Sequence, residues 1–384
     1  PMEKPLVLGP DHSWPITFKA YGREKPVFSG GRRIQDWREG TVHGCRAWIA
    51  DLPEVAAGEW HFRSLFVNGR RAERPRLPET GFYRMASIPN AALPTGWDNR
   101  HYDQFIAAPG EARDFHNRSD VEAVYVHFWI EERSPLKSVD PASGRVVMMR
   151  PSFTTPVGSF GSQPADYYFD NVFEALHRPG QWYLDRVAGR LYYLPRKGET
   201  PANTVVYAPR VLQLLGVIGC PEENRFVEHI RFEGITFAHT DWRHPDVSDG
   251  ATLIGSQPST PSHSRRHGRG SYAAAAQAAC DVPGVILFEG ARHCAIENCV
   301  LESLGWYGLE IGDGCKGIRV VGNTLRDLGA GGVKINGAAA RDANVRLRAT
   351  GHHRITDNTL CRGGRVFHSA VGVLAMNAHS LAIC

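Results

Sequence analysis

The sequence predicts an all-β protein, a right-handed parallel β-helix interrupted near its N-terminus by an inserted β-sandwich or barrel-like domain. Its composition is the first observation, because 384 residues include 40 Gly, 25 Pro and 38 aromatics (17 Phe, 12 Tyr and 9 Trp). Turn-rich, aromatic-rich chains of this kind are typical of large β proteins and exclude a helical bundle. The other two observations are a repeat in the second half and its absence from most of the first half.

The repeat consists of strand-like segments that alternate apolar and polar residues, the pattern of a half-buried β-strand. Cys299 and Asn323 hold the same place in two such segments and lie 24 residues apart, which is one coil of a parallel β-helix. The next interval, to Asn358, is 35 residues and indicates a coil with a longer turn. The interval of 64 before Cys299 fits one coil with a large excursion, or two coils. The aligned segments are Ile230–Phe237, Cys294–Leu301, Ile318–Leu325 and His353–Leu360.

Asn323 and Asn358 fall at the same position of a shared Asn-Thr-Leu phrase. We predict that they occupy equivalent sites in successive coils, with their side-chain amides bonded along the solenoid axis. A simpler alternative is that asparagine is favoured at a turn, and both can hold together.

Most of the first half carries hairpin signals in place of the repeat. Phe66–Arg70 contains Asn-Gly, which suits a type I′ turn, and Trp182–Leu194 places Gly189 where a left-handed residue is needed. Val121–Ile130 is a strongly β-forming run, whereas Pro15–Gly30 again resembles a coil. The expected organisation is first coils at 1–46, an inserted β-rich domain at 47–205 and further coils at 206–384.

Charge and composition exclude several functional classes. A formal net charge of +4 is too small for this length to indicate nucleic-acid binding. No run of 18 apolar residues exists, so no membrane-spanning helix is predicted. The eight cysteines form no Cys-x-x-Cys pair, which argues against a zinc ribbon or a thioredoxin-like motif. We expect mostly free, buried thiols, with one or two disulfides as the alternative.

Both ends of the chain read as the interior of a longer protein. The first residues resemble the middle of a strand-rich domain, and the last ones stop inside the repeat. The expectation is a fragment whose last coil lacks a cap and which aggregates or dimerises end to end.

Several phrases together resemble a known family. They are Trp182–Leu194, Phe66–Arg76, Gly329–Ile335 (GAGGVKI) and Gly363–Val373 (GGRVFHSAVGV). They resemble secreted carbohydrate-active enzymes with a parallel β-helix and an inserted β-domain, most closely glycoside hydrolase family 141, which includes α-L-fucosidase and xylanase activities. The resemblance implies a secreted or periplasmic hydrolase of xylan- or fucoside-type plant or bacterial polysaccharide, without a cofactor. It also implies further C-terminal coils beyond this chain.

Glycoside hydrolysis needs one carboxylic acid to protonate the leaving oxygen and a second carboxylate as nucleophile or base. Adjacent coils stack at about 4.8 Å, so carboxylates one or two coils apart on one outer face suit this chemistry. Asp313 is our leading catalytic residue because it follows a strand, and the alternative is an Asp that caps a turn. Glu310 is predicted to point outward as a second catalytic candidate beside Lys334, the alternative being a solvated ion pair. The next coil has Gly337 where Asp313 would align, so a partner would come from Asp342, Asp241, Asp249 or absent coils.

Two further segments carry candidate substrate contacts. Arg365 could bind a sugar hydroxyl or a uronate, and His368 could act as acid or base, unless both merely decorate an edge. In the irregular excursion His239–Cys280, Asp241, Trp242 and Asp249 could contact a sugar, with Trp242 stacking on the ring. Its basic run at 263–269 reads as a solvated loop, and no metal-ligand spacing such as His-Glu-x-x-His occurs.

Three classes of function therefore remain open. A glycoside hydrolase uses paired carboxylates. A polysaccharide lyase would abstract a proton next to a uronate with Lys, Arg or His, often with calcium. A non-catalytic β-helix adhesin or carbohydrate-binding module would lack an acidic groove. The inserted domain and the excursion containing Trp242 favour the hydrolase.

Overall fold

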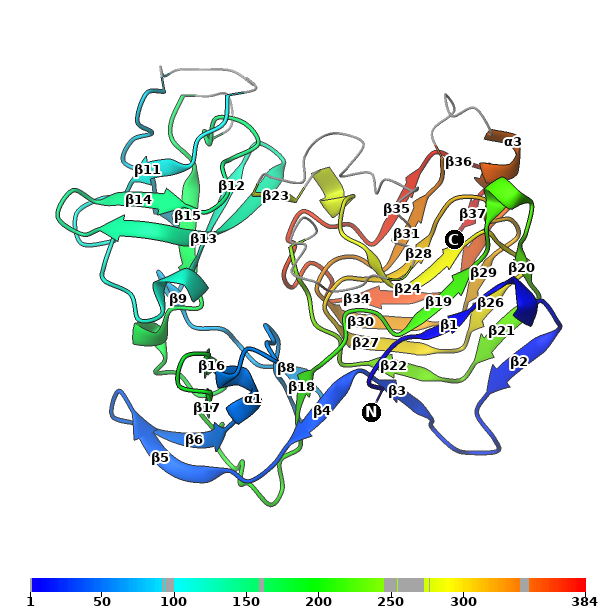
Figure 1. Cartoon of the computed structure of the whole chain (residues 1–384), viewed down its shortest axis with the longest axis horizontal. Helices are drawn as coiled ribbons and strands as arrows, with labels where there is room; N and C mark the ends of the chain where they lie inside the picture. The colour runs from blue at the N-terminus through cyan, green and yellow to red at the C-terminus, as the bar shows by residue number, and fades with distance from the viewer. Residues whose placement is uncertain are drawn as a thin grey trace.

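The computed structural model describes residues 2–91, 93, 100–158, 162–244, 254, 273–275, 277–338 and 345–384. A solenoid of parallel strands occupies one side of the molecule, and antiparallel sheets occupy the other (Figure 1). The fold is thus all-β with a parallel β-helix, as the sequence predicted.

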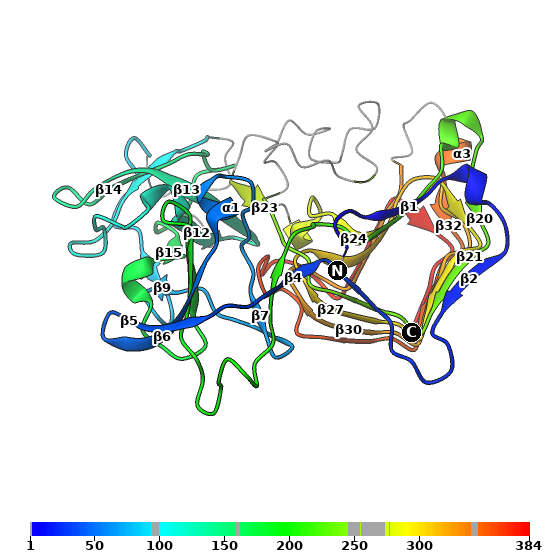
Figure 2. The ribbon, with the colours of Figure 1, turned by 60° about the horizontal axis from the view of Figure 1, so that its bottom comes forward.

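Three parallel sheets form the walls of the solenoid (Figure 2). Sheet 1 contains β1 (Leu6–Leu8), β19 (Leu215–Ile218), β24 (Gly284–Glu289), β28 (Tyr307–Ile311), β31 (Val333–Asn336) and β35 (Val373–Met376). Sheet 2 contains β2 (Ile16–Lys19), β21 (Ile230–Glu233), β26 (Ala295–Glu297), β29 (Arg319–Val321), β33 (Arg354–Thr356) and β37 (Ala382–Ile383). Sheet 3 contains β3 (Val27–Ser29), β22 (Thr236–Ala238), β27 (Val300–Leu304), β30 (Thr324–Leu328) and β34 (Thr359–Cys361).

Short elements complete the corners between sheets 1 and 2. Two parallel pairs lie there, β20 (Val227–Glu228) with β25 (Ala291–Arg292), and β32 (Thr350–Gly351) with β36 (Ala378–His379). The single-turn helices of the solenoid are η1 (Pro10–His12), η5 (Pro221–Glu223), η6 (Gln277–Ala279) and α3 (Val345–Arg348). None of the helices in the described part of the chain is long and apolar enough to cross a bilayer.

The register of the sheets explains the sequence repeat. Thr236 pairs with Val300, which pairs with Thr324, which pairs with Thr359. The interval of 64 residues is therefore a single coil with a long excursion. Apolar residues at every second strand position point into the solenoid, where Phe18 stacks on Phe232 at 4.9 Å between ring centroids. Cys294, Cys299 and Cys315 are buried thiols, and Cys361 and Cys384 are exposed thiols.

The predicted asparagine ladder is confirmed at the corner between sheets 2 and 3. Asn323 Nδ2 donates to Asn358 Oδ1 at 2.9 Å and to Ile296 O at 3.0 Å. Asn323 Oδ1 accepts from the Cys299 amide at 2.9 Å, and Asn358 Nδ2 donates to Val320 O at 2.8 Å. The two amides thus satisfy backbone groups of two successive coils that would otherwise be buried without partners.

Asn323→Ala is expected to lower the free energy of unfolding by about 3 kcal/mol, because it leaves the buried Cys299 amide and Ile296 carbonyl unpaired. Urea denaturation measures the change. The matched variant Asn224→Ala, on the surface turn after η5, is expected to cost far less. Equal losses for the two variants would contradict a structural role for the ladder.

The chain leaves the solenoid after β3 and returns at β19, and the antiparallel sheets lie between. β4 (Gly31–Ile34) and β18 (Val206–Pro209) pair where the chain departs and returns, so antiparallel structure begins at Gly31, within the range 1–46 assigned to first coils. The same sheet continues through β7 (Phe66–Val67) and β8 (Arg70–Arg71), joined by a turn with positive φ at Asn68 and Gly69, as predicted.

Two further antiparallel sheets make up the insertion. The smaller contains β5 (Arg38–Val42), β6 (Cys45–Asp51), β16 (Trp182–Asp185) and β17 (Arg190–Tyr193), with α1 (Pro53–Ala56) beside it and Gly189 at φ 63° as expected. The larger contains β9 (Arg76–Leu77), β10 (Tyr83–Arg84), β11 (Gln104–Ile106), β12 (Glu122–His127), β13 (Ile130–Asp140), β14 (Arg145–Met148), β15 (Asp166–Asp170) and β23 (Ala274–Ala275). Helices η2 (Arg118–Asp120) and η4 (Phe173–Ala175) connect them.

Long connections of the solenoid share one edge. The insertion, the excursion after β22 and residues 362–372 all leave the ends of sheet 3 strands and lead into sheet 1. We call this the loop edge. The opposite edge of sheet 1 faces η5 and α3 (Figure 1).

Candidate functional site

The outer face of sheet 1 carries three carboxyl groups on adjacent strands, Glu289, Glu310 and Asp313, which we call the acidic cluster. Phe288 pairs with Ile311, and both side chains are buried in the core. Because side chains alternate along a strand, Glu289 and Glu310 point outward. Asp313 follows β28, next to η5 and α3.

Glu310 points outward as predicted, but its ion pair with Lys334 is covered and not solvated. Lys334 Nζ lies 2.9 Å from Glu310 Oε1, and only 2% of the Lys334 side chain is exposed. The chain returning from the excursion covers the pair, since Lys334 donates to Val282 O at 2.6 Å and Glu310 Oε2 accepts from the Gly284 amide at 2.8 Å. Both residues therefore hold this segment on sheet 1.

Asp313 forms an ion pair with Arg348 of α3, whose Nε lies 3.1 Å from Asp313 Oδ2. The side chains are 13% and 14% exposed, so water still reaches them. Glu222 of η5 lies 3.7 Å from the same guanidinium. The contact thus orients the Asp313 carboxylate at the end of β28.

Glu289 is the carboxyl that the sequence analysis missed. Its Cβ and Cγ would lie 3.7 Å from a Cβ on Gly312, so the absence of a side chain there leaves room beside Asp313. Burial and the negative charges of Asp313, Glu310 and Glu222 raise the pKa of Glu289 to about 8. Among the described residues, the Glu289 carboxyl has no hydrogen-bond or ion-pair partner. Aligning β24 with β28 would have revealed it, because Glu289 lies opposite Gly312, one coil before Glu310 and Asp313.

The acidic cluster therefore combines a carboxyl that stays protonated at neutral pH with carboxylates held by cations. Environments that separate the pKa values of neighbouring carboxyls assign acid and base roles in glycosidases. Within the described part of the chain, no three His, Cys, Asp or Glu side chains converge as ligands of one metal ion would.

A second site lies at the loop edge, where the insertion meets the solenoid. Its pocket has a volume of about 380 Å³ and is lined by seven arginines and three carboxylates, and we call it the arginine pocket. The lining residues come from the insertion, from the start of the excursion and from the loop before β35: Arg63, Arg71, Arg74, Arg76, Arg133, Arg178, Arg365, Glu73, Glu79, Asp170, Ser64, Ala72, Tyr168, Trp242, Val366 and His368.

Arg365 and His368 both line this pocket, at the opposite end of sheet 1 from Asp313. His368 Nδ1 is hydrogen bonded to Glu131 Oε2, which belongs to β13 of the insertion. The His368 side chain is 53% exposed while that of Glu131 is 3% exposed. A buried carboxylate thus orients an accessible imidazole across the junction.

Asp241 and Trp242 are both buried, whereas we expected them to contact a sugar. Trp242 is 1% exposed, and the guanidinium groups of Arg63, Arg74 and Arg133 lie within 5.5 Å of its ring centroid, so its faces are covered. Asp241 is buried and accepts the Arg63 amide at 2.9 Å, and burial raises its pKa to about 6. Asp249, Asp342 and the run at 263–269 lie outside the described residues.

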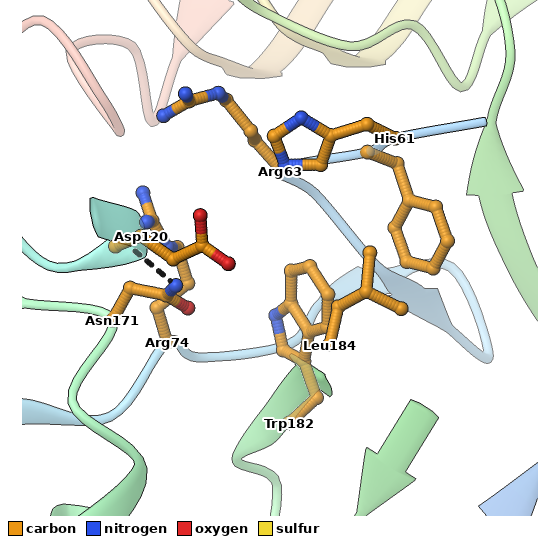
Figure 3. Close-up of a pocket in the computed structure, with 8 residues that line it drawn as sticks. His61, Arg63, Arg74, Asp120, Asn171, Trp182 and Leu184 are labelled. Carbon is orange, nitrogen blue, oxygen red and sulfur yellow. Dashed lines mark hydrogen bonds between the residues drawn. The ribbon is translucent and has the colours of Figure 1, made fainter. Parts of the chain in front are cut away.

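A small cavity lies inside the insertion (Figure 3). Its volume of about 10 Å³ suits a single water molecule. Arg63 and Arg74 line both this cavity and the arginine pocket. Burial and the charges of neighbouring arginines, Arg63 first, lower the pKa of His61 to about 2, so this histidine adds no positive charge.

Comparison with protein-family models gives a match for the antiparallel part. Residues 45–196 match the model of the GH141 insertion domain. This segment therefore resembles the insertion domain of that family. The chain is thus related to glycoside hydrolase family 141, which confirms the resemblance drawn from the sequence.

A solved structure shares the fold. A protein described as a glycoside hydrolase matches with a TM-score of 0.74 and 23% sequence identity, over 97% of this chain and 66% of that one. The chain therefore spans slightly less than two thirds of that protein. A structure entitled "The complex structure of XylC with xylose" matches with a TM-score of 0.34 and 14% identity, over 93% of this chain and 46% of that one. Comparison with curated protein sequences gives no match.

Proposed function

We propose that this protein is a glycoside hydrolase that cleaves a xylan- or fucoside-type polysaccharide on the outer face of sheet 1. The observation that carries the proposal is the raised pKa of Glu289 beside Asp313 and Glu310. The relationship to family 141 supports the reaction class. Because polysaccharides do not enter cells intact, the proposal includes a secreted or periplasmic location.

In this proposal Glu289 is the general acid and Asp313 is the second carboxylate. Protonated Glu289 gives its proton to the glycosidic oxygen as the bond to the anomeric carbon breaks. Asp313 either attacks the anomeric carbon or takes a proton from the attacking water, and Arg348 keeps it oriented. Glu310 is a positioning residue, since its carboxylate is bonded to Lys334 and the Gly284 amide while its charge favours the protonated form of Glu289.

Release of reducing sugar from xylan and of nitrophenol from aryl xylosides and fucosides tests the proposed activity. We expect Asp313→Asn to reduce turnover by at least about 10²-fold. Loss of the partly exposed pair with Arg348 should cost about 1 kcal/mol of stability, measured by thermal unfolding. Asp357→Asn, on the exposed corner between sheets 2 and 3, is the matched control and should retain turnover. Wild-type turnover in Asp313→Asn would remove Asp313 from the mechanism.

A polysaccharide lyase is the second candidate, and the His368–Glu131 contact beside Arg365 favours it. In a lyase, arginines neutralise a uronate carboxylate while a base removes the adjacent proton, and the glycosidic oxygen leaves with its electron pair. The product is unsaturated and absorbs in the ultraviolet, whereas hydrolysis gives no such absorbance. Incubation with pectin therefore separates the two reactions.

A further inference from the structure

We propose that the arginine pocket binds an acidic sugar residue of the glycan, through an oxyanion carried by the sugar as a carboxylate or an ester sulfate. This site is separate from the acidic cluster. β28 begins at Tyr307, close to the start of the excursion, and ends next to Asp313, so the two sites lie toward opposite ends of the same strand. The acidic sugar would be recognised apart from the bond that is cleaved.

The charges around the pocket favour an anion. Its lining holds seven arginines against Glu73, Glu79 and Asp170. Four more acids sit next to lining residues without lining the pocket themselves, so the excess of arginine is confined to the lining: Glu122, Glu131, Asp241 and Asp327. Glu73 and Glu79 are both bound to Arg178, at 3.6 and 3.7 Å.

Two lining arginines have no carboxylate partner among the described residues. Arg76 donates to the Pro78 and Gly81 carbonyls, and its guanidinium lies 3.8 Å from the centroid of the Tyr168 ring. Arg365 is exposed, and its side chain makes no hydrogen bond or ion pair within the described part of the chain. Guanidinium forks of this kind bind carboxylate and sulfate oxygens in pairs.

A buried polar atom also lacks a partner at this site. Arg133 is 4% exposed and lines the pocket, and its Nε has no hydrogen-bond partner among the described residues. Its Nη1 binds Asp170 at 2.7 Å and Glu122 at 3.0 Å, whereas Nη2 lies 3.8 Å from Glu131, beyond hydrogen-bond distance. Arg133 therefore adds positive charge to the wall of the pocket, while its buried Nε lies below the surface that a ligand would touch.

The size of the pocket suits a saccharide. About 380 Å³ falls within the range of small-ligand sites, roughly 300–1,000 Å³. Residues from both the insertion and the solenoid enclose the pocket, so ligand binding would depend on the packing of the insertion against the solenoid. This gives the GH141 insertion domain a role in substrate selection.

Isothermal titration calorimetry with three probes tests this inference without any turnover. Tetragalacturonide carries carboxylates, a sulfated galactotetraose carries ester sulfates, and xylotetraose is neutral. We expect at least one acidic probe to bind about tenfold tighter than xylotetraose, and Arg365→Gln to weaken that binding about tenfold. Arg362→Gln removes the same charge from the same loop but outside the pocket, and it should leave binding unchanged.

The outcomes distinguish the sources of the anion and the failure of each proposal. Tighter binding of the sulfated probe assigns the anion to an ester sulfate, and tighter binding of the galacturonide assigns it to a uronate. Equal binding of acidic and neutral probes, no binding of any probe, or an equal loss in Arg362→Gln would overturn the inference. Absence of glycosidic cleavage would contradict the hydrolase alone, because binding is measured independently.

Discussion

Glu289→Gln is expected to reduce kcat/KM by about 10²–10⁴-fold for glycosides with poor leaving groups. The amide keeps the shape of the carboxyl but cannot give a proton to the leaving oxygen. Nitrophenyl glycosides, whose leaving group needs little protonation, should lose far less activity. Steady-state rates on a natural oligosaccharide and on its nitrophenyl analogue measure the difference. An equal loss on both substrates would contradict the role of general acid.

The pH dependence of the same variant gives a second readout. The pKa of Glu289 is raised from about 4.5 to about 8, so its protonated form is stabilised by folding. This contribution is fully present below pH 4.5 and is lost as the pH rises through about 8. Wild-type kcat/KM should therefore fall above pH 8. Glu289→Gln should unfold at a higher temperature than the wild type at pH 9, whereas the control Glu302→Gln, on sheet 3, should not.

Arg133→Met is expected to lower the free energy of unfolding by about 3–5 kcal/mol. Arg133 binds Glu122 and Asp170, and all three residues are buried, so the variant removes a charge that compensates two carboxylates. Burial disfavours ionisation of Glu122, yet Arg63, Arg133 and Arg74 hold its pKa well below its usual range. Chemical denaturation at neutral pH measures the loss.

The matched control is Arg84→Met, which breaks an ion pair with Asp166 whose side chains are 56% and 38% exposed. Solvent screens such a pair, so its loss should cost far less than the loss of Arg133. Because the pKa of Glu122 is depressed, its stabilising contribution is present above about pH 4.5 and is lost on further acidification. The gap between Arg133→Met and the wild type should therefore narrow in acid. A gap that is unchanged or wider in acid would contradict an electrostatic origin.

The solenoid could be predicted from the sequence because its interactions recur at a fixed interval. Asn323 and Asn358 bond to the neighbouring coil, so the residue type repeats wherever the coil repeats. The hairpins could also be predicted, because their tight turns require positive φ angles, which Asn68, Gly69 and Gly189 adopt readily. Antiparallel structure at 31–34 was missed because β4 pairs with β18, more than 170 residues away in the chain, whereas the hairpin of β5 with β6 is local and its turn was overlooked.

The acidic cluster was partly predictable. Glu310 and Asp313 follow from alternation along one strand, but Glu289 required the register between β24 and β28. The burial of Lys334 depended on the chain at 280–284, whose sequence gives no periodic signal. Trp242 appeared suited to a sugar ring because its cover of arginines comes from the distant segments at Arg63, Arg74 and Arg133.

By itself the sequence determined the all-β class, the coil period, the asparagine ladder and the local turns, because each depends on neighbours at a constant spacing. Only the tertiary structure decided the pKa values of the carboxyl groups and the clustering of arginines around one pocket. A pKa shift depends on burial and on charges from η5, α3 and the next strand, which approach only after folding. The arginine pocket likewise forms where the insertion meets the loop edge, between residues up to about 300 positions apart.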